Sequence, residues 1–97
     1  MDIQRINNGN KGFFQAMENG VQAGLMTYSW AGNDKFIIDH TEVDEKFNGQ
    51  GVGKKMVMEA VDFARSNNLK IIPLCPFVKS VFDKVAEIQD VRAWSAN

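Results

Sequence analysis

The chain is poor in the residues that build disulfides and metal centres. Its 97 residues include one cysteine, one histidine and two prolines. A single cysteine cannot form an internal disulfide, which fits a reducing cytoplasm. One histidine and one cysteine are also too few for a typical cluster of metal ligands. We therefore expect a cytoplasmic protein that holds no metal.

Long apolar runs and an excess of one charge are also missing. No run approaches the roughly 18 apolar residues of a transmembrane helix, and the stretch from Met1 to Arg5 lacks the apolar character of a signal peptide. The net charge is −1, and no basic stripe alternates with aromatic residues, so neither a membrane nor a nucleic acid is an expected partner. With 44% hydrophobic residues, we expect one folded domain over residues 1–97.

The first half of the chain has the pattern of four strands joined by short turns. Apolar and β-branched stretches at 3–6, 12–18, 21–31 and 35–43 are separated by clusters of asparagine, glycine and aspartate. Asn19 and Gly20 both tolerate the positive φ of a type I′ hairpin turn. These features predict an antiparallel meander. The third stretch has apolar residues on both faces, which suggests a central strand covered on each side.

Strict alternation in the fourth stretch assigns its side chains to two faces. One face carries Phe36, Ile38, His40 and Glu42, and the other carries Ile37, Asp39, Thr41 and Val43. Since His40 shares its face with two apolar residues, the plain structural interpretation is a half-buried core histidine.

Helical spacing begins after the fourth strand. Apolar residues recur through 51–66 and predict a helix, with Asn67 and Asn68 as a left-handed stop. Residues 70–74 have the pattern of a short fifth strand. A strand, a helix and a strand within about 40 residues imply a right-handed parallel crossover.

The last part of the chain predicts a second helix. Pro76 is suited to its first position, and the helix is expected to run to about Glu87. In the tail, Val91 and Trp94 are candidates to pack on the sheet. The expected fold class is α/β (α+β), a mixed sheet of about five strands, four antiparallel and one parallel, with two main helices packed on it.

The most informative stretch runs from Glu42 to Lys55 and carries glycines at 49, 51 and 53. Glycine permits positive φ and a close approach of a ligand to the backbone. A helix that begins in such a loop points free N–H groups and its positive dipole end outward, so it can bind a phosphate. Lys54 and Lys55 oppose that dipole, at roughly 0.3–1 kcal/mol each, and a bound anion would remove the conflict. The spacing fits neither the dinucleotide-binding motif nor the P-loop, so a nucleotide-binding domain is the weakest interpretation.

This loop resembles the pyrophosphate loop of the GNAT superfamily, the acyl-CoA-dependent N-acetyltransferases. The residues that fall on the family motif are Val43, Phe47, Gly49, Gly51, Val52 and Gly53. Asn48 stands where the family usually has arginine or glutamine, and Glu45 stands where proline is common. The expected element order is similar to the family core over residues 2–88. The chain has no room for the helices after the first strand or for the last two strands. It looks like a small truncated subfamily in which a Cys-Pro-Phe segment follows the fifth strand.

The resemblance implies that acetyl-CoA is the co-substrate and that the fourth and fifth strands splay apart around its pantetheine arm. Backbone groups near the end of the fourth strand would bind that arm as a further strand would. The implied coenzyme A contacts are Thr41, Glu42, Val43, Asn48, Gly49, Gln50, Gly51, Val52, Gly53 and Lys54. We expect a monomer that passes an acetyl group to an unknown amine or protein acceptor.

Cys75 and His40 are the candidate catalytic residues. Cys75 falls at the expected N-cap of the second helix, where the dipole favours a thiolate. Most family members have an asparagine here and a proton-donating tyrosine seven residues later, but that later position is Phe82. If the strand register allows it, His40 could accept the Cys75 proton and the thiolate could take the acyl group. The alternative is direct attack by an acceptor amine, with His40 or Glu42 as the base and a backbone N–H near Val43 for the oxyanion.

Plainer interpretations stand beside these hypotheses. Cys75 could be a small buried apolar residue, and Glu42 and Asp44 could be solvated loop charges. The aromatic residues Phe13, Phe14, Tyr28 and Trp30 fit a core better than a ligand platform. Because the usual acid and the acceptor-shaping elements are missing, a non-catalytic acyl-CoA-binding or sensing module is the alternative to a transferase.

Overall fold

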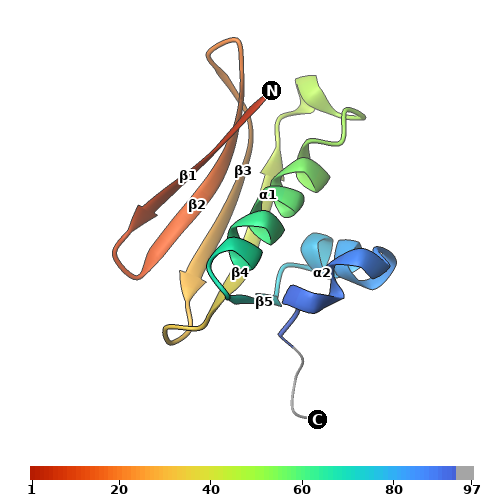
Figure 1. Cartoon of the computed structure of the whole chain (residues 1–97). Coiled ribbons are helices and arrows are strands. Elements are labelled where there is room, and N and C mark those ends of the chain that lie inside the picture. Colours follow the sequence, from red (N-terminus) through yellow and green to blue (C-terminus); the bar gives the residue numbers. More distant parts are fainter. Residues whose placement is uncertain (94–97) are drawn as a thin grey trace.

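The computed structural model describes residues 1–93 (Figure 1). In chain order its elements are β1 (Asp2–Asn8), β2 (Lys11–Glu18), β3 (Val21–Trp30), β4 (Lys35–Val43), η1 (Glu45–Phe47), α1 (Val52–Ser66), β5 (Lys70–Pro73), α2 (Pro76–Lys84) and η2 (Ala86–Val91), where η marks a 3-10 helix. Within this range no helix has the length and apolar character needed to cross a membrane. Trp94 lies outside the described residues, and so does the packing predicted for it.

The strands form one sheet in the order β1-β2-β3-β4-β5. β1 to β4 are an antiparallel meander and β5 runs parallel to β4, so the predicted mixed sheet is confirmed. Asn19 and Gly20 have φ values of 50° and 78° in the turn between β2 and β3, as the hairpin signal predicts. β1 is longer than predicted, because Asp2 and Asn8 also pair with β2.

The helices cover one face of the sheet. α1 crosses this face, and α2 lies beside α1 next to β5 (Figure 1). Phe14 and Ile38 are fully buried between the sheet and the helices. On the opposite face, Gln15 Nε2 donates to Gln4 Oε1 at 2.9 Å in an exposed position. The prediction that β3 is covered on both sides is therefore wrong.

A β-bulge in β3 explains part of that error. Ala16 pairs with Gly24 and Met17 pairs with Gln22, so Ala23 is an extra residue on the β3 side of the ladder. The bulge shifts the alternation by one position. As a result Ala23, at an odd position of β3, reaches the same core as Met26, and both are fully buried, whereas Val21 is exposed.

The first helix follows its prediction closely, and the second does not. The buried stripe of α1 contains Val52, Met56, Val57, Ala60, Val61 and Ala64, and Asn68 has a φ of 58° in the predicted left-handed stop. α2 ends at Lys84, short of the predicted end near Glu87. Val85 is extended, and Gln89 Nε2 donates to the carbonyl oxygens of Phe82 (2.6 Å) and Val85 (2.8 Å). These bonds satisfy the end of the helix, and the chain continues as η2.

Ion pairs hold η2 against both helices. Arg65 of α1 makes a two-point contact with Asp90, with Nε–Oδ2 and Nη2–Oδ1 distances of 2.9 Å. Hydrogen bonding from Arg65 lowers the pKa of Asp90 below its ordinary value. Hydrogen bonds from Lys79 and then Arg92 lower the pKa of Asp83 in the same way. Val91, at the end of η2, is buried as predicted.

An aromatic cluster fills the end of the core where β3 ends and β4 begins. Its members are Phe14, Tyr28, Trp30, Phe36 and Phe63, with neighbouring ring centroids 5.3–6.3 Å apart. The Tyr28 hydroxyl accepts from Arg5 Nη1 (2.9 Å) and donates to Asn7 Oδ1 (3.0 Å). The preference for a core role is thus confirmed for Phe14 and Tyr28, which are 1% exposed.

Candidate functional site

A second bulge, at Asp39, controls which β4 side chains face the helices. Tyr28 pairs with Ile38 and Thr27 pairs with His40, which leaves Asp39 as the extra residue of β4. A bulge places two residues opposite one on the neighbouring strand. Side-chain alternation after the bulge is therefore offset by one residue from alternation before it.

This offset exchanges the two predicted faces in the second half of β4. Thr41 now lies opposite the buried Met26 and faces the helices. His40 and Glu42 lie on the open face, where His40 Nε2 is 3.4 Å from Glu42 Oε2 and the imidazole side chain is 62% exposed. The predicted grouping of His40 and Glu42 with the apolar residues of β4 is wrong, because strict alternation makes no allowance for the extra residue.

β4 continues past the end of β5. The pairing between these strands ends at Ile38 and Pro73. The N–H groups of Leu74 and Cys75 then both donate to the Ile38 carbonyl, at 3.1 and 2.9 Å. The chain turns away into α2, so the two strands splay apart from this point.

The splay leaves backbone groups of β4 directed toward an opening. The N–H of Asp44 donates to Ala23 of β3 at 2.9 Å. Backbone groups of successive residues in a strand point to alternate sides. The N–H and C=O groups of Thr41 and Val43 therefore point away from β3, toward the side where β5 has ended.

The glycine loop ends in the first turn of α1. Gly49 and Gly51 have φ values of 82° and 72°, which residues with a Cβ atom rarely adopt. Gly51 is the N-cap, and its carbonyl accepts from Lys55 N–H at 3.0 Å. The N–H groups of Val52, Gly53 and Lys54 precede the first bond of the helical ladder, so they point out of the helix end.

Gly53 is a glycine for a different reason. It is inside the helix, but a Cβ at this position would lie 2.6 Å from Cζ of Phe77. Phe77 belongs to the first turn of α2 and is 41% exposed. The missing side chain thus lets the Phe77 ring rest on the start of α1.

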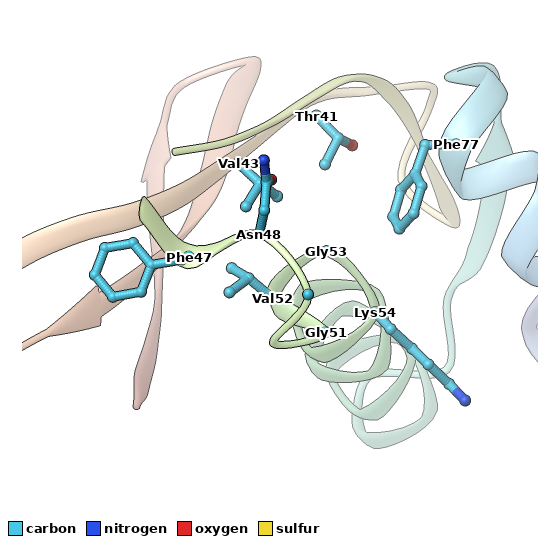
Figure 2. A pocket seen from close by; sticks show the side chains of 10 residues that line it. Thr41, Val43, Phe47, Asn48, Gly51, Val52, Gly53, Lys54 and Phe77 are labelled. Carbon is cyan, nitrogen blue, oxygen red and sulfur yellow. The ribbon is translucent and has the colours of Figure 1, made fainter. Parts of the chain in front are cut away.

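These features enclose a groove of about 370 Å³ between β4, the glycine loop and the start of α2. Figure 2 shows Thr41 and Val43 on one side, Phe77 on another, and the start of α1 below them. The lining residues are Thr41, Val43, Phe47, Asn48, Gly49, Gly51, Val52, Gly53, Lys54 and Phe77. The groove combines apolar walls, an open strand edge and the N-terminus of a helix. Such a site suits an extended apolar arm that ends in an anion.

Most of the predicted coenzyme A contacts lie on this groove, with two exceptions. Glu42 is on the open face beside His40, and Gln50 is an exposed loop residue outside the groove lining. Phe47 and Phe77 line the groove and were not among the predicted contacts. The Cys-Pro-Phe segment was a signal for Phe77, but its position depends on how α2 sits against α1.

The two lysines at the start of α1 differ in position. Lys54 lines the groove and also a second hollow of about 520 Å³ between β1 and α1. Lys55 lines the second hollow but not the groove. Lys54 is therefore the better placed of the two to meet an anion at the glycine loop.

Cys75 occupies the predicted position at the start of α2. It is the N-cap residue, followed by Pro76 at the first helical position, and it is 6% exposed. Its Sγ atom lies 3.5 Å from Oγ1 of Thr41. The bulge therefore brings Thr41 to the thiol and turns His40 to the other face of the strand. Phe82, at the position of the usual tyrosine, is fully buried in the core.

The fold and site together define a member of an acetyltransferase family. The sequence model of the GCN5-related N-acetyltransferases matches residues 13–91. The chain belongs to this family. Within the described residues, no group of three or more histidine, cysteine, aspartate or glutamate side chains is arranged to hold a metal.

Particular relatives agree with this assignment. The solution structure of a GCN5-like protein from Staphylococcus aureus is 37% identical, has a TM-score of 0.70, and the match covers 97% of this chain and 91% of that one. Protein NATD1 of Xenopus tropicalis is 29% identical over 55 residues, which span 57% of this chain and half of that protein. A Bacillus anthracis protein assigned as a streptothricin acetyltransferase was solved in complex with acetyl coenzyme A. It shares the fold, with a TM-score of 0.61 and 23% identity over 81% of this chain and 48% of its own.

Proposed function

We propose that the protein binds acetyl-CoA in the groove and transfers its acetyl group to an amine acceptor. The observation that carries this proposal is the open edge of β4 beside the N-terminus of α1. Thr41 and Val43 offer backbone groups to the pantetheine arm, and the N–H groups that follow Gly51 offer an anion site to the pyrophosphate. The acetyl-CoA complex of the Bacillus anthracis relative supports the choice of ligand.

Two chemical routes are compatible with this binding mode. In the first, Cys75 Sγ attacks the acetyl carbonyl, the bond from the carbonyl carbon to the coenzyme A sulfur breaks, and the thiol proton passes to the departing sulfur. An acceptor amine then attacks the Cys75 thioester and releases the thiol. The contact between Cys75 Sγ and Oγ1 of the groove residue Thr41 supports this route.

In the second route, the acceptor amine attacks acetyl-CoA directly. His40 and Glu42 form a contact on the open face, next to the splay of β4 and β5. An imidazole paired with a carboxylate can take a proton from an amine that approaches from this face. In this route, His40 acts on the acceptor and not on Cys75.

A non-catalytic acyl-CoA-binding module is the second candidate. Its supporting observation is Phe82, which is fully buried and offers no hydroxyl to protonate a departing thiolate. Such a module would bind coenzyme A and leave acetyl-CoA intact.

Intact-protein mass after incubation with acetyl-CoA tests these proposals, with binding measured separately by titration calorimetry. The first route predicts one acetyl adduct that is released by hydroxylamine and missing in Cys75→Ala, while Cys75→Ala still binds coenzyme A. Direct transfer predicts no adduct but turnover with an amine. Binding without adduct or turnover would support the module. If ATP or NAD binds better than coenzyme A at equal concentration, the acyl-CoA proposal fails.

A further inference from the structure

At the start of α2, two kinds of polar group are possible hydrogen-bond partners for the Cys75 side chain: the free N–H groups of the first turn and the hydroxyl of Thr41. As the N-cap residue, it could direct its side chain to the free N–H groups of the first turn. It makes no such side-chain bond to the helix. The thiol instead donates toward Thr41 Oγ1 at 3.5 Å.

Thr41 connects this thiol with the groove. It is half-buried, lines the groove, and comes from the open edge of β4 (Figure 2). Its direction depends on the Asp39 bulge, since a regular pairing of Asp39 with Thr27 would place His40 on this face instead. The bulge therefore places a hydroxyl where strict alternation predicts an imidazole.

A hydroxyl at this position can serve both forms of the thiol. Its oxygen accepts a hydrogen bond from the neutral S–H, and its proton can be donated to the thiolate. A hydrogen bond to the charged form favours that form over the neutral one. An imidazole would remove the thiol proton, whereas a threonine hydroxyl orients the sulfur and stabilises its negative charge.

We propose that Thr41 is the positioning residue for Cys75, holding the thiol beside this groove residue and favouring its thiolate. This inference rests on the proposed thioester route for its role in catalysis, but the contact itself can be tested without any acyl donor. Cys75 is the only cysteine of the chain, so thiol alkylation reports on it alone.

The experiment measures the rate of Cys75 alkylation by iodoacetamide across pH 6 to 10, by intact-protein mass, in wild type and variants. Thr41→Val keeps the shape and removes the hydroxyl. We expect its rate profile to move toward higher pH, with about tenfold slower alkylation at pH 7. Thr41→Ser keeps a hydroxyl and should stay near the wild-type profile. Thr41→Ala provides a second loss of the hydroxyl if the valine variant does not fold.

His40→Gln is the contrasting variant, and its alkylation profile should match that of wild type. A wild-type profile in both Thr41→Val and Thr41→Ala would overturn the proposal. So would a shift in His40→Gln as large as that in Thr41→Val, because it would make the imidazole the group that controls the thiol. If the Thr41 shift appears but acetyl-CoA leaves no adduct on the wild type, the contact stands and the thioester route fails.

Discussion

The two halves of β4 differ in what surrounds them. From Lys35 to Ile38 the strand pairs with β3 on one edge and β5 on the other, and Phe36 and Ile38 are fully buried. From His40 to Val43 it pairs with β3, while the edge facing β5 opens onto the groove. One extra residue and the early end of a neighbouring strand thus turn a core strand into a binding edge.

A substitution in the closed half of β4, from Lys35 to Ile38, should cause the largest loss of stability. We expect Ile38→Ala to lower the free energy of unfolding by about 2–5 kcal/mol, because it removes a fully buried side chain and leaves a cavity. Denaturant unfolding measures this change. Val43→Ala, in the half-buried open half, should cost clearly less. An equal loss in both variants would contradict the distinction between the halves.

Substitutions of Gly51 should show whether backbone strain explains the glycine at this position. Gly51→Ala forces a Cβ into a left-handed conformation with a φ of 72°, and we expect a loss of about 1–2 kcal/mol in unfolding free energy. Gly51→Asn should lose less, because asparagine tolerates this conformation. Thermal and denaturant unfolding compare the two. Equal losses would mean that φ is not the constraint.

Gly53→Ala should act on the groove more than on stability. The new Cβ would displace the exposed end of the Phe77 ring, while alanine favours the helix. We expect unfolding free energy to change by less than about 1 kcal/mol and coenzyme A affinity to fall about threefold, or roughly 0.65 kcal/mol. In a double-mutant cycle with Phe77→Ala, the two effects should not add. Full additivity would show that the ring contact is unrelated to binding.

Acidification should produce the smallest of these effects on stability. The pKa values of Asp83 and Asp90 are lowered in the folded protein. Their contribution to stability is therefore present above the ordinary carboxyl pKa, near 4, and is lost as pH falls through the lowered folded values. The wild type should lose more thermal stability between pH 5 and pH 2 than Asp90→Asn. Glu59→Gln, on the exposed side of α1, is the control. Identical acid profiles in wild type and Asp90→Asn would show that the Arg65–Asp90 ion pair does not contribute to the loss of stability in acid.

The architecture could be predicted because local signals agreed with it. The turn at Asn19 and Gly20, the apolar stripe of α1 and Pro76 at the start of α2 each had a simple pattern, and each is confirmed. The glycine loop was informative for the same reason. Positive φ at Gly49 and Gly51 is a backbone requirement that the sequence shows directly.

The site could be predicted only in part, because bulges have no reliable sequence pattern. Asp39 reads as an ordinary strand residue, yet it determines whether His40 or Thr41 meets Cys75. The end of α2 was missed for a similar reason. Gln89 replaces lost helical bonds from a position five residues past the helix, which local spacing does not reveal.

Amide chemical-shift mapping during a titration with coenzyme A tests the central claim most directly. We predict that the largest shifts fall on Thr41, Val43 and the amides of residues 49–54, while Lys35 to Ile38 and the aromatic cluster change little. Such a result would place the ligand along the open half of β4 and at the start of α1. Shifts centred on the open face of the sheet, or no shifts at saturating coenzyme A, would contradict the account.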